Sequence, residues 1–158
     1  MVPKTEQALE RAHASCVQHK TFIKIDRQSY ADYRDEALAD IASAKKEDDV
    51  RWAVVKAYQA LFHQCTAVLV KNLCVYSKDH GCLITALLKH QLIEKETLER
   101  VHVMLDHKKT LFDEIDRIRI SRNKALYFPK TVSKLGKEEA DKIIEEVRQL
   151  LVILGEQL

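Results

Sequence analysis

The sequence has few of the residues that interrupt helices. Among 158 residues there are only 3 glycines and 2 prolines, and aromatic side chains make up 6% of the chain. Tight β-turns depend on glycine and proline, so their scarcity argues against a protein built from hairpins. The chain is instead rich in Ala, Leu, Lys and Glu, which is typical of helical proteins. We therefore predict an all-α protein.

The chain also lacks an excess of charge of either sign. Its 26 basic and 24 acidic residues leave a net charge of +2, so only a local basic cluster would attract nucleic acid. No long apolar run occurs, because the longest uncharged stretch, residues 57–70, is shorter than the roughly 18 residues of a membrane span. The N-terminal sequence MVPKTEQALERAH carries charges where a signal peptide requires an apolar segment. We predict a soluble cytoplasmic protein.

The familiar signatures of cofactor and metal sites are missing. There is no G-x-x-x-x-G-K-S/T, G-x-G-x-x-G or G-x-S-x-G motif, and the E-x-x-H at 99–102 does not by itself make a di-iron site, which needs such motifs in pairs together with further glutamates. His63 is interpreted as a core or interface histidine, and the pair His80 and Cys82 has no second pair to complete a zinc site. We predict neither a cofactor nor a metal.

The four cysteines form no C-x-x-C pair. Cys16, Cys65, Cys74 and Cys82 all lie in apolar, helix-like surroundings. A chain of this length buries enough surface to fold without a disulfide. We therefore expect buried free thiols in a reducing cytosol.

Helical periodicity covers most of the chain. Apolar residues recur at helical spacing over 5–19, 29–46, 50–73, 79–90, 94–127 and 137–157. Thr5, Asp48 or Asp49, and Ser77 or Asp79 precede helices as caps. Residues 21–25 are β-like but isolated, and we interpret them as a connector. Short turns between these helices predict an up-and-down bundle of about five to six helices.

The helix expected over 50–73 is apolar on more than one side. Such a helix is central or lies in a dimer interface. Because it carries more apolar surface than one neighbouring layer needs, we predict a homodimer, with Phe62 and Leu69 at the interface.

The stretch RIRISRNKALYF, residues 117–128, gathers cations near a helix end. Arg119, Asn123 and Tyr127 are spaced by four and share a face, with Arg122 beside them. The guanidinium groups of arginine can donate two hydrogen bonds each to phosphate oxygens, and an amide and a phenol can add neutral hydrogen bonds. A solvated helix face is the alternative, and spacing alone favours it. The candidate phosphate-binding residues are Arg119, Arg122, Asn123, Lys124 and His80.

Three segments resemble motifs of the HEPN superfamily of small helical-bundle proteins. Residues 54–63 resemble the AxxxAYxAxFH pattern of its second core helix, and 77–81 resemble the K-x-H start of its third. Residues 122–127 align with its R-x4-6-H motif. The resemblance implies a four-helix core within residues 29–158, preceded by a helical extension over 1–28.

The resemblance implies a function related to RNA or nucleotides. In active HEPN proteins the motif Arg and His form a metal-independent RNase, with sites from two protomers facing one cleft. Here Arg122 matches, but Tyr127 stands at the histidine position and no histidine follows it. A phenol, with a pKa near 10, is a poor general base at neutral pH. The subgroup that the chain resembles most consists of small prokaryotic, largely archaeal proteins that accompany a minimal nucleotidyltransferase.

Three functions remain open at this point. The first is a dimeric binding and regulatory module that partners a minimal nucleotidyltransferase, or holds nucleotide or RNA phosphates without efficient cleavage. The second is a toxin-like, metal-independent endoribonuclease in which Arg122 acts with Tyr127 or His80 as the proton carrier. The third is a purely structural helical interaction domain. We rank them in this order because the motif histidine is missing.

Overall fold

The computed structural model describes residues 3, 5–105 and 136–158, and it is an all-α bundle, as predicted. Residues 95–105 are also helical. The named helices and strands, in chain order, are α1 (Glu6–Gln18), β1 (Phe22–Lys24), the 3-10 turn η1 (Arg27–Ser29), α2 (Tyr30–Lys46), α3 (Val50–Leu73), β2 (Val75–Ser77), α4 (His80–Lys89) and α6 (Lys137–Gly155).

Side chains that cap the helices define where several of them begin. The Thr5 hydroxyl accepts a hydrogen bond from the backbone N–H of Ala8 at 3.2 Å, before α1. The Asp49 carboxylate accepts from the backbone N–H groups of Arg51 and Trp52 before α3, and Asp79 accepts from that of Cys82 before α4. Each cap satisfies donors that have no partner within the helix. The predicted cap at Thr5 is thereby confirmed, and of the two alternatives left open at each of the other helices the cap is Asp49 before α3 and Asp79 before α4.

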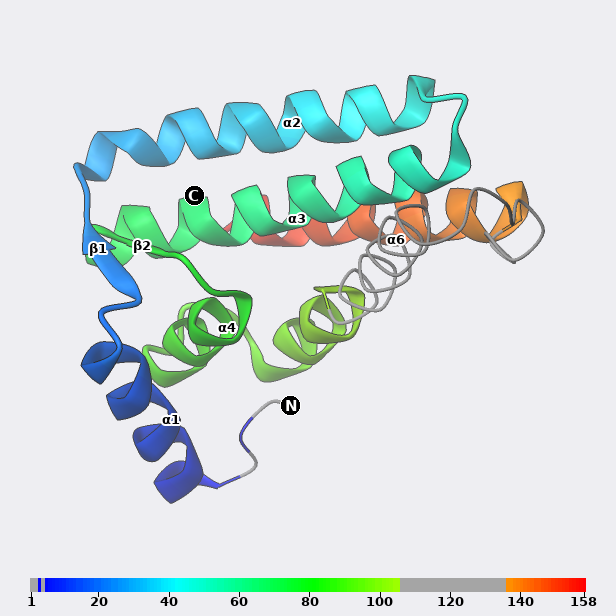
Figure 1. The fold of residues 1–158 in the computed structure, drawn as a ribbon. Helices are drawn as coiled ribbons and strands as arrows, with labels where there is room; N and C mark the ends of the chain where they lie inside the picture. The colour runs from blue at the N-terminus through cyan, green and yellow to red at the C-terminus, as the bar shows by residue number, and fades with distance from the viewer. Residues whose placement is uncertain (1–2, 4, 106–135) are drawn as a thin grey trace, which may run out of the picture.

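Helix α3 is the centre of the molecule. Figure 1 shows α2 running antiparallel above it, with α6 behind it and α4 below. Most of α3 is inaccessible, and Ala57, Leu61, Val68 and Leu69 have no exposed surface at all. Helix α6 runs in the same direction as α3: Ala140 near its start packs beside Val54, and Lys71 donates a hydrogen bond to the carbonyl of Leu158. The apolar surroundings of α3 are thus filled by the chain itself.

The two residues proposed for a dimer interface belong to this internal core. Leu69 is 0% exposed and Phe62 is 8% exposed. Leu69 therefore has no surface left to offer a partner. The apolar residues of α3 that suggested an interface are covered by α2, α4 and α6, because these helices pack on it from different sides.

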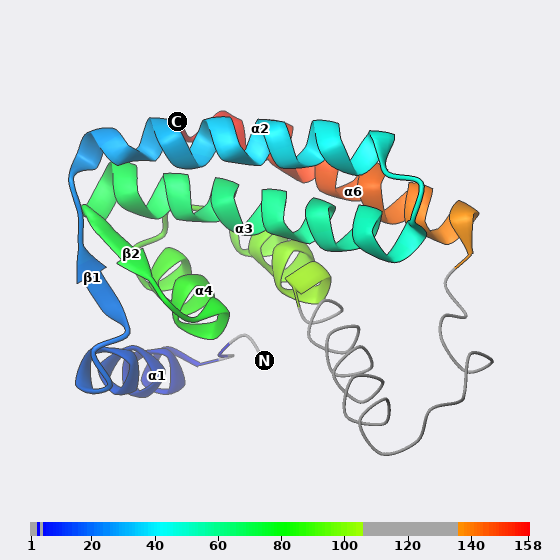
Figure 2. The same cartoon turned by 45° about the horizontal axis from the view of Figure 1, so that its top comes forward.

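The segment 21–25, expected to be an isolated connector, forms a strand instead. Strand β1 pairs with β2 in antiparallel register, with Phe22 opposite Ser77, Ile23 opposite Tyr76 and Lys24 opposite Val75. β2 follows directly after α3, so the length of α2 and α3 returns the chain to the same end of the bundle (Figure 2). The prediction was wrong because the partner strand is distant in the sequence.

The prediction of four free thiols was wrong for one pair. Cys16 of α1 and Cys82 of α4 form a disulfide, with their Cα atoms 5.8 Å apart and a sequence separation of 66 positions. Cys65 and Cys74 are free, and Cys65 is buried as expected. The bond forms because α1 packs against α4, a tertiary contact that cysteine spacing does not reveal.

Replacing Leu69 by alanine tests whether this residue is structural. We expect Leu69→Ala to lower the free energy of unfolding by about 2–5 kcal/mol, because it leaves a cavity in a fully packed core. Leu38→Ala is the matched control: Leu38 is 55% exposed on α2, and its loss should change stability by less than about 0.5 kcal/mol. Urea denaturation followed by circular dichroism measures both. Equal effects of the two substitutions would contradict the burial of Leu69.

Candidate functional site

Most of the predicted phosphate-binding residues lie outside the described part of the chain. Arg119, Arg122, Asn123, Lys124 and Tyr127 all fall within residues 106–135. Their roles therefore stay predictions. His80 is the member of the set that the structure describes, so the site is built from its neighbourhood.

His80 is the first residue of α4 and lies against a core side chain. Its ring centroid is 4.5 Å from that of Phe62, at an interplanar angle of 48°. Phe62 also approaches His63, the next residue of α3, with centroids 6.2 Å apart. The buried Phe62 ring thus has an imidazole on each of two sides, one from α3 and one from α4.

His63 is held by polar groups from two helices. Its Nδ1 is 3.0 Å from the Asp40 carboxylate on α2, and its Nε2 is 3.0 Å from the Gln59 amide nitrogen on α3. An ionised carboxylate only accepts hydrogen bonds and an amide nitrogen only donates them. With the Gln59 amide placed this way, Nδ1 is the nitrogen that donates to Asp40 and Nε2 is the one that accepts from Gln59. The side chains of His63 and Asp40 are 20% and 24% exposed, so solvent reaches the pair.

Two tyrosines extend this cluster toward the sheet. The rings of Tyr33 on α2 and Tyr76 on β2 stack at 5.9 Å with an interplanar angle of 12°, and Tyr33 lies 6.1 Å from His63. Burial, together with the neighbouring Tyr76 and Asp32, raises the pKa of Tyr33 above its ordinary value, so it stays a neutral phenol. A continuous aromatic row follows from β2 to α4, made of Tyr76, Tyr33, His63, Phe62 and His80.

The sequence reasoning missed Asp40 and gave His63 only a packing role. A signal was available in the register of the α2–α3 hairpin. Glu47 and Lys56, on either side of the turn, form an ion pair at 2.5 Å. Asp40 and His63 each lie seven residues further from that turn, which is about two helical turns along both helices. An antiparallel hairpin with short loops therefore brings the second pair together as it does the first.

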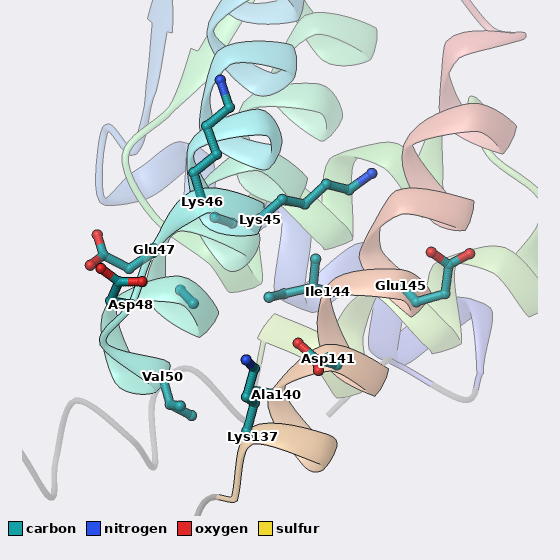
Figure 3. Close-up of a pocket in the computed structure, with 12 residues that line it drawn as sticks. Lys45, Lys46, Glu47, Asp48, Val50, Lys137, Ala140, Asp141, Ile144 and Glu145 are labelled. Carbon is teal, nitrogen blue, oxygen red and sulfur yellow. The ribbon is translucent and has the colours of Figure 1, made fainter.

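A pocket of about 360 Å³ lies at the other end of the hairpin, between the α2–α3 turn and the start of α6 (Figure 3). Three lysines and four carboxylates line it, so its charges nearly cancel. The Arg148 guanidinium, with help from Gln149 and Lys45, lowers the pKa of Glu145 at its rim to about 2. A cradle for phosphate needs an excess of donors, which this pocket lacks. The charged residues in its lining are Lys45, Lys46, Lys137, Glu47, Asp48, Asp141 and Glu145.

Within residues 3, 5–105 and 136–158, no three His, Cys, Asp or Glu side chains gather in a way that would hold a metal ion. Among the helices described, none combines the length and apolar character needed to cross a membrane. The described chemistry is therefore that of the aromatic row and its oriented imidazole. The half-buried rings of this row offer faces on which bases can stack, and both nitrogens of His63 are engaged by Asp40 and Gln59.

The structure is therefore that of a small helical-bundle domain, built around the antiparallel α2–α3 hairpin and with imidazole side chains at the edge of that hairpin. The family model described as HEPN domain matches residues 30–157, and the chain belongs to the HEPN family. The predicted resemblance is confirmed, and the match begins at the first residue of α2, which leaves α1 and β1 outside it. No curated protein and no solved structure matches the chain.

A double-mutant cycle tests the contact between Asp40 and His63. We expect Asp40→Ala and His63→Ala to show a coupling energy of about 0.5–1 kcal/mol in urea denaturation, because the pair is hydrogen bonded but partly solvated. Arg34 and Asp35 are a matched control, since they form an ion pair at 2.9 Å between more exposed side chains. Their coupling should be smaller. A coupling of zero for Asp40 and His63 would mean that Asp40 does not orient the imidazole.

Proposed function

We propose that this HEPN protein is a dimeric binding and regulatory module that holds RNA or nucleotide phosphates without efficient cleavage and partners a minimal nucleotidyltransferase. Family membership supports the general link to RNA and nucleotides. The cation-rich stretch 117–128 supplies the expected phosphate ligands. The partner and the binding mode are part of the proposal.

The observation that carries the proposal is the residue at position 127. In the R-x4-6-H motif the arginine neutralises phosphate charge and the histidine transfers protons. This chain keeps Arg122, places Tyr127 after it, and has no histidine beyond His107. Binding depends on the cation and survives this replacement, whereas proton transfer at neutral pH depends on the missing imidazole. We therefore place binding ahead of cleavage.

The aromatic row adds a second element that suits single-stranded RNA. Tyr33, Tyr76 and His63 are half-buried, so part of each ring remains accessible. Stacking on aromatic rings is tolerant of base identity, and it is worth about 1–3 kcal/mol for each base. Such rings, in a chain that also carries the basic stretch 117–128, would bind RNA with little sequence preference.

Replacing Arg122 tests the phosphate-binding role. We expect Arg122→Ala to weaken binding of labelled single-stranded RNA roughly 10- to 100-fold, because a charge-assisted hydrogen bond is worth about 1.5–3 kcal/mol. Arg148→Ala is the matched control, since Arg148 is already neutralised by Glu145 at 2.7 Å. Fluorescence polarisation at fixed salt measures both. Equal affinities for the wild type and Arg122→Ala would remove the basis of the proposal.

A metal-independent endoribonuclease is the second candidate, and one observation favours it. The His63 imidazole is oriented by Asp40 at 3.0 Å, which is how many catalytic histidines are positioned. Incubating the RNA with EDTA separates the two candidates. Cleavage that is lost in both Arg122→Ala and His63→Gln would establish the nuclease, and uncut RNA retained by the wild type would support binding.

The dimer is proposed to use one stripe of α3 that begins at the exposed Trp52 and continues over half-buried residues. Trp52, Lys56, Gln59 and His63 are spaced by three or four residues and share one face of the helix. Trp52 is 54% exposed, which is unusual for so large an apolar side chain and favours a contact surface. Two copies that meet along this stripe would bring both His63 rings to one shared cleft.

A charge at Trp52 tests this interface. We expect Trp52→Glu to convert a dimer at micromolar concentration into a monomer, because it buries an unpaired carboxylate. Val152→Glu, at a position that is 58% exposed on α6, serves as the control and should leave the dimer intact. Sedimentation velocity distinguishes the two states. A dimeric Trp52→Glu variant would place the interface elsewhere, and a monomeric wild type would contradict the dimer itself.

A further inference from the structure

Helix α1 is attached to the bundle along one face of α4. Figures 1 and 2 both place α4 between α1 and the α2–α3 hairpin. The Cys16–Cys82 disulfide joins one end of this contact, and an ion pair between Glu10 and Lys89 at 2.6 Å joins the other. Between them, His13 packs edge-on against His90, with ring centroids 5.8 Å apart. The two helices are therefore held by one covalent bond, these polar contacts and a few half-buried side chains of α1, among them Leu9 and Ala12.

The non-covalent part of this attachment is weak. Cys16 is the single buried residue of α1, while Val17 is 56% exposed. The Glu10 side chain is 57% exposed, and ion pairs in that setting contribute little. Burial, together with the neighbouring Lys89 and His90, outweighs Glu10 and lowers the pKa of His13, so acidification would oppose docking further. The disulfide thus supplies most of what keeps α1 in place.

The bundle does not depend on α1 for its core. Apart from Cys16, every buried apolar residue of the described chain lies at or beyond Ala37, within the segment that matches the HEPN family. Releasing α1 would leave that core intact. The strand pairing of Phe22–Lys24 with Val75–Ser77 would still hold the chain just after α1. Helix α1 would then move about residues 19–21.

We propose that Cys16 and Cys82 form a thiol–disulfide couple that controls the docking of α1 on α4, with small thiols of the glutathione class as its exchange partner. Cys82 keeps more exposed surface than Cys16, which is 8% exposed, so we take Cys82 as the residue that the incoming thiolate attacks. Cys82 lies in the first turn of α4, where the helix dipole favours a thiolate, and the Asp79 carboxylate in the same turn offsets part of this effect.

The exchange proceeds in two balanced steps. A small thiolate attacks the Cys82 sulfur, the bond to Cys16 breaks, and its electron pair leaves on the Cys16 sulfur, which takes a proton from water. A second thiolate attacks the small-thiol sulfur of the mixed disulfide, and the Cys82 sulfur leaves with that electron pair. Two small thiols are oxidised to one small disulfide, and the protein disulfide is reduced to two thiols. Oxidation by the small disulfide reverses both steps.

The two free cysteines, Cys65 and Cys74, differ from the Cys16–Cys82 pair in how they can take part in thiol exchange. Burial raises the pKa of the Cys65 thiol to about 12, so at neutral pH it stays a protonated thiol inside the core. Cys74 lies at the end of α3 and is half-buried. It provides the matched serine substitution for the test, because it changes a thiol of the chain and leaves the Cys16–Cys82 pair intact.

Limited proteolysis of the full chain in glutathione buffers tests the couple. We expect reduction to accelerate tryptic cleavage after Arg11, in α1, by about tenfold or more, because undocked helices open readily. The helical signal of the bundle should remain. Cys16→Ser and Cys82→Ser should show the fast cleavage without reductant, and Cys74→Ser should respond like the wild type. Mass spectrometry after alkylation reports whether Cys16 and Cys82 are joined.

Three results would overturn the proposal. The first is that Cys16 and Cys82 remain free thiols after the protein is equilibrated with the small disulfide. The second is an intact bond whose reduction leaves cleavage after Arg11 unchanged, which would mean that non-covalent contacts hold α1. The third is cooperative loss of the whole helical signal on reduction, which would mean that the disulfide stabilises the entire fold and does not control α1 alone. The wild type with and without reductant decides among them even if a cysteine variant fails to fold.

Discussion

The burial of α3 on nearly all sides is the constraint on which the rest of the structure depends. Residues such as Leu61 and Val68 have no exposed surface, so α2, α4 and α6 must each present an apolar face to this one helix. Removing that much apolar surface from water is the dominant favourable contribution to folding. The directions of the surrounding helices, and the return of the chain that pairs β1 with β2, follow from it.

The paired polar side chains lie at the edge of this apolar packing. At the rim of the α2–α3 contact the helices still face each other, but water reaches their side chains, so charged groups are tolerated there. The register of the hairpin then places Lys56 opposite Glu47 and His63 opposite Asp40. The oriented imidazole is thus a consequence of the helix packing, and the aromatic row extends it toward β2 and α4. HEPN family membership links the protein in general to RNA and nucleotides.

The molecule is held together in two different ways. The segment that matches the HEPN family is stabilised by a continuous apolar core, whereas α1 contributes one buried residue and is joined to α4 by a disulfide. A core of this kind opens only when the whole domain unfolds, but a helix held by one bond and a few polar contacts opens separately. This difference is what makes a chemical change at Cys16 and Cys82 able to alter one element without disturbing the others.

Features that depend on neighbours within about one helical turn were determined by the sequence. The all-α class, the bounds of α3 and the caps at Thr5, Asp49 and Asp79 follow from helical spacing and from side chains bonding to backbone a few residues away. The phosphate-binding role of residues 117–128 stays a prediction from the sequence, because these residues lie outside the described part of the chain. Only the tertiary structure decided which distant residues meet, because each such contact depends on how whole helices pack. These contacts are the pairing of Phe22 with Ser77, the bond between Cys16 and Cys82, the hydrogen bond of Asp40 to His63, and the enclosure of Leu69.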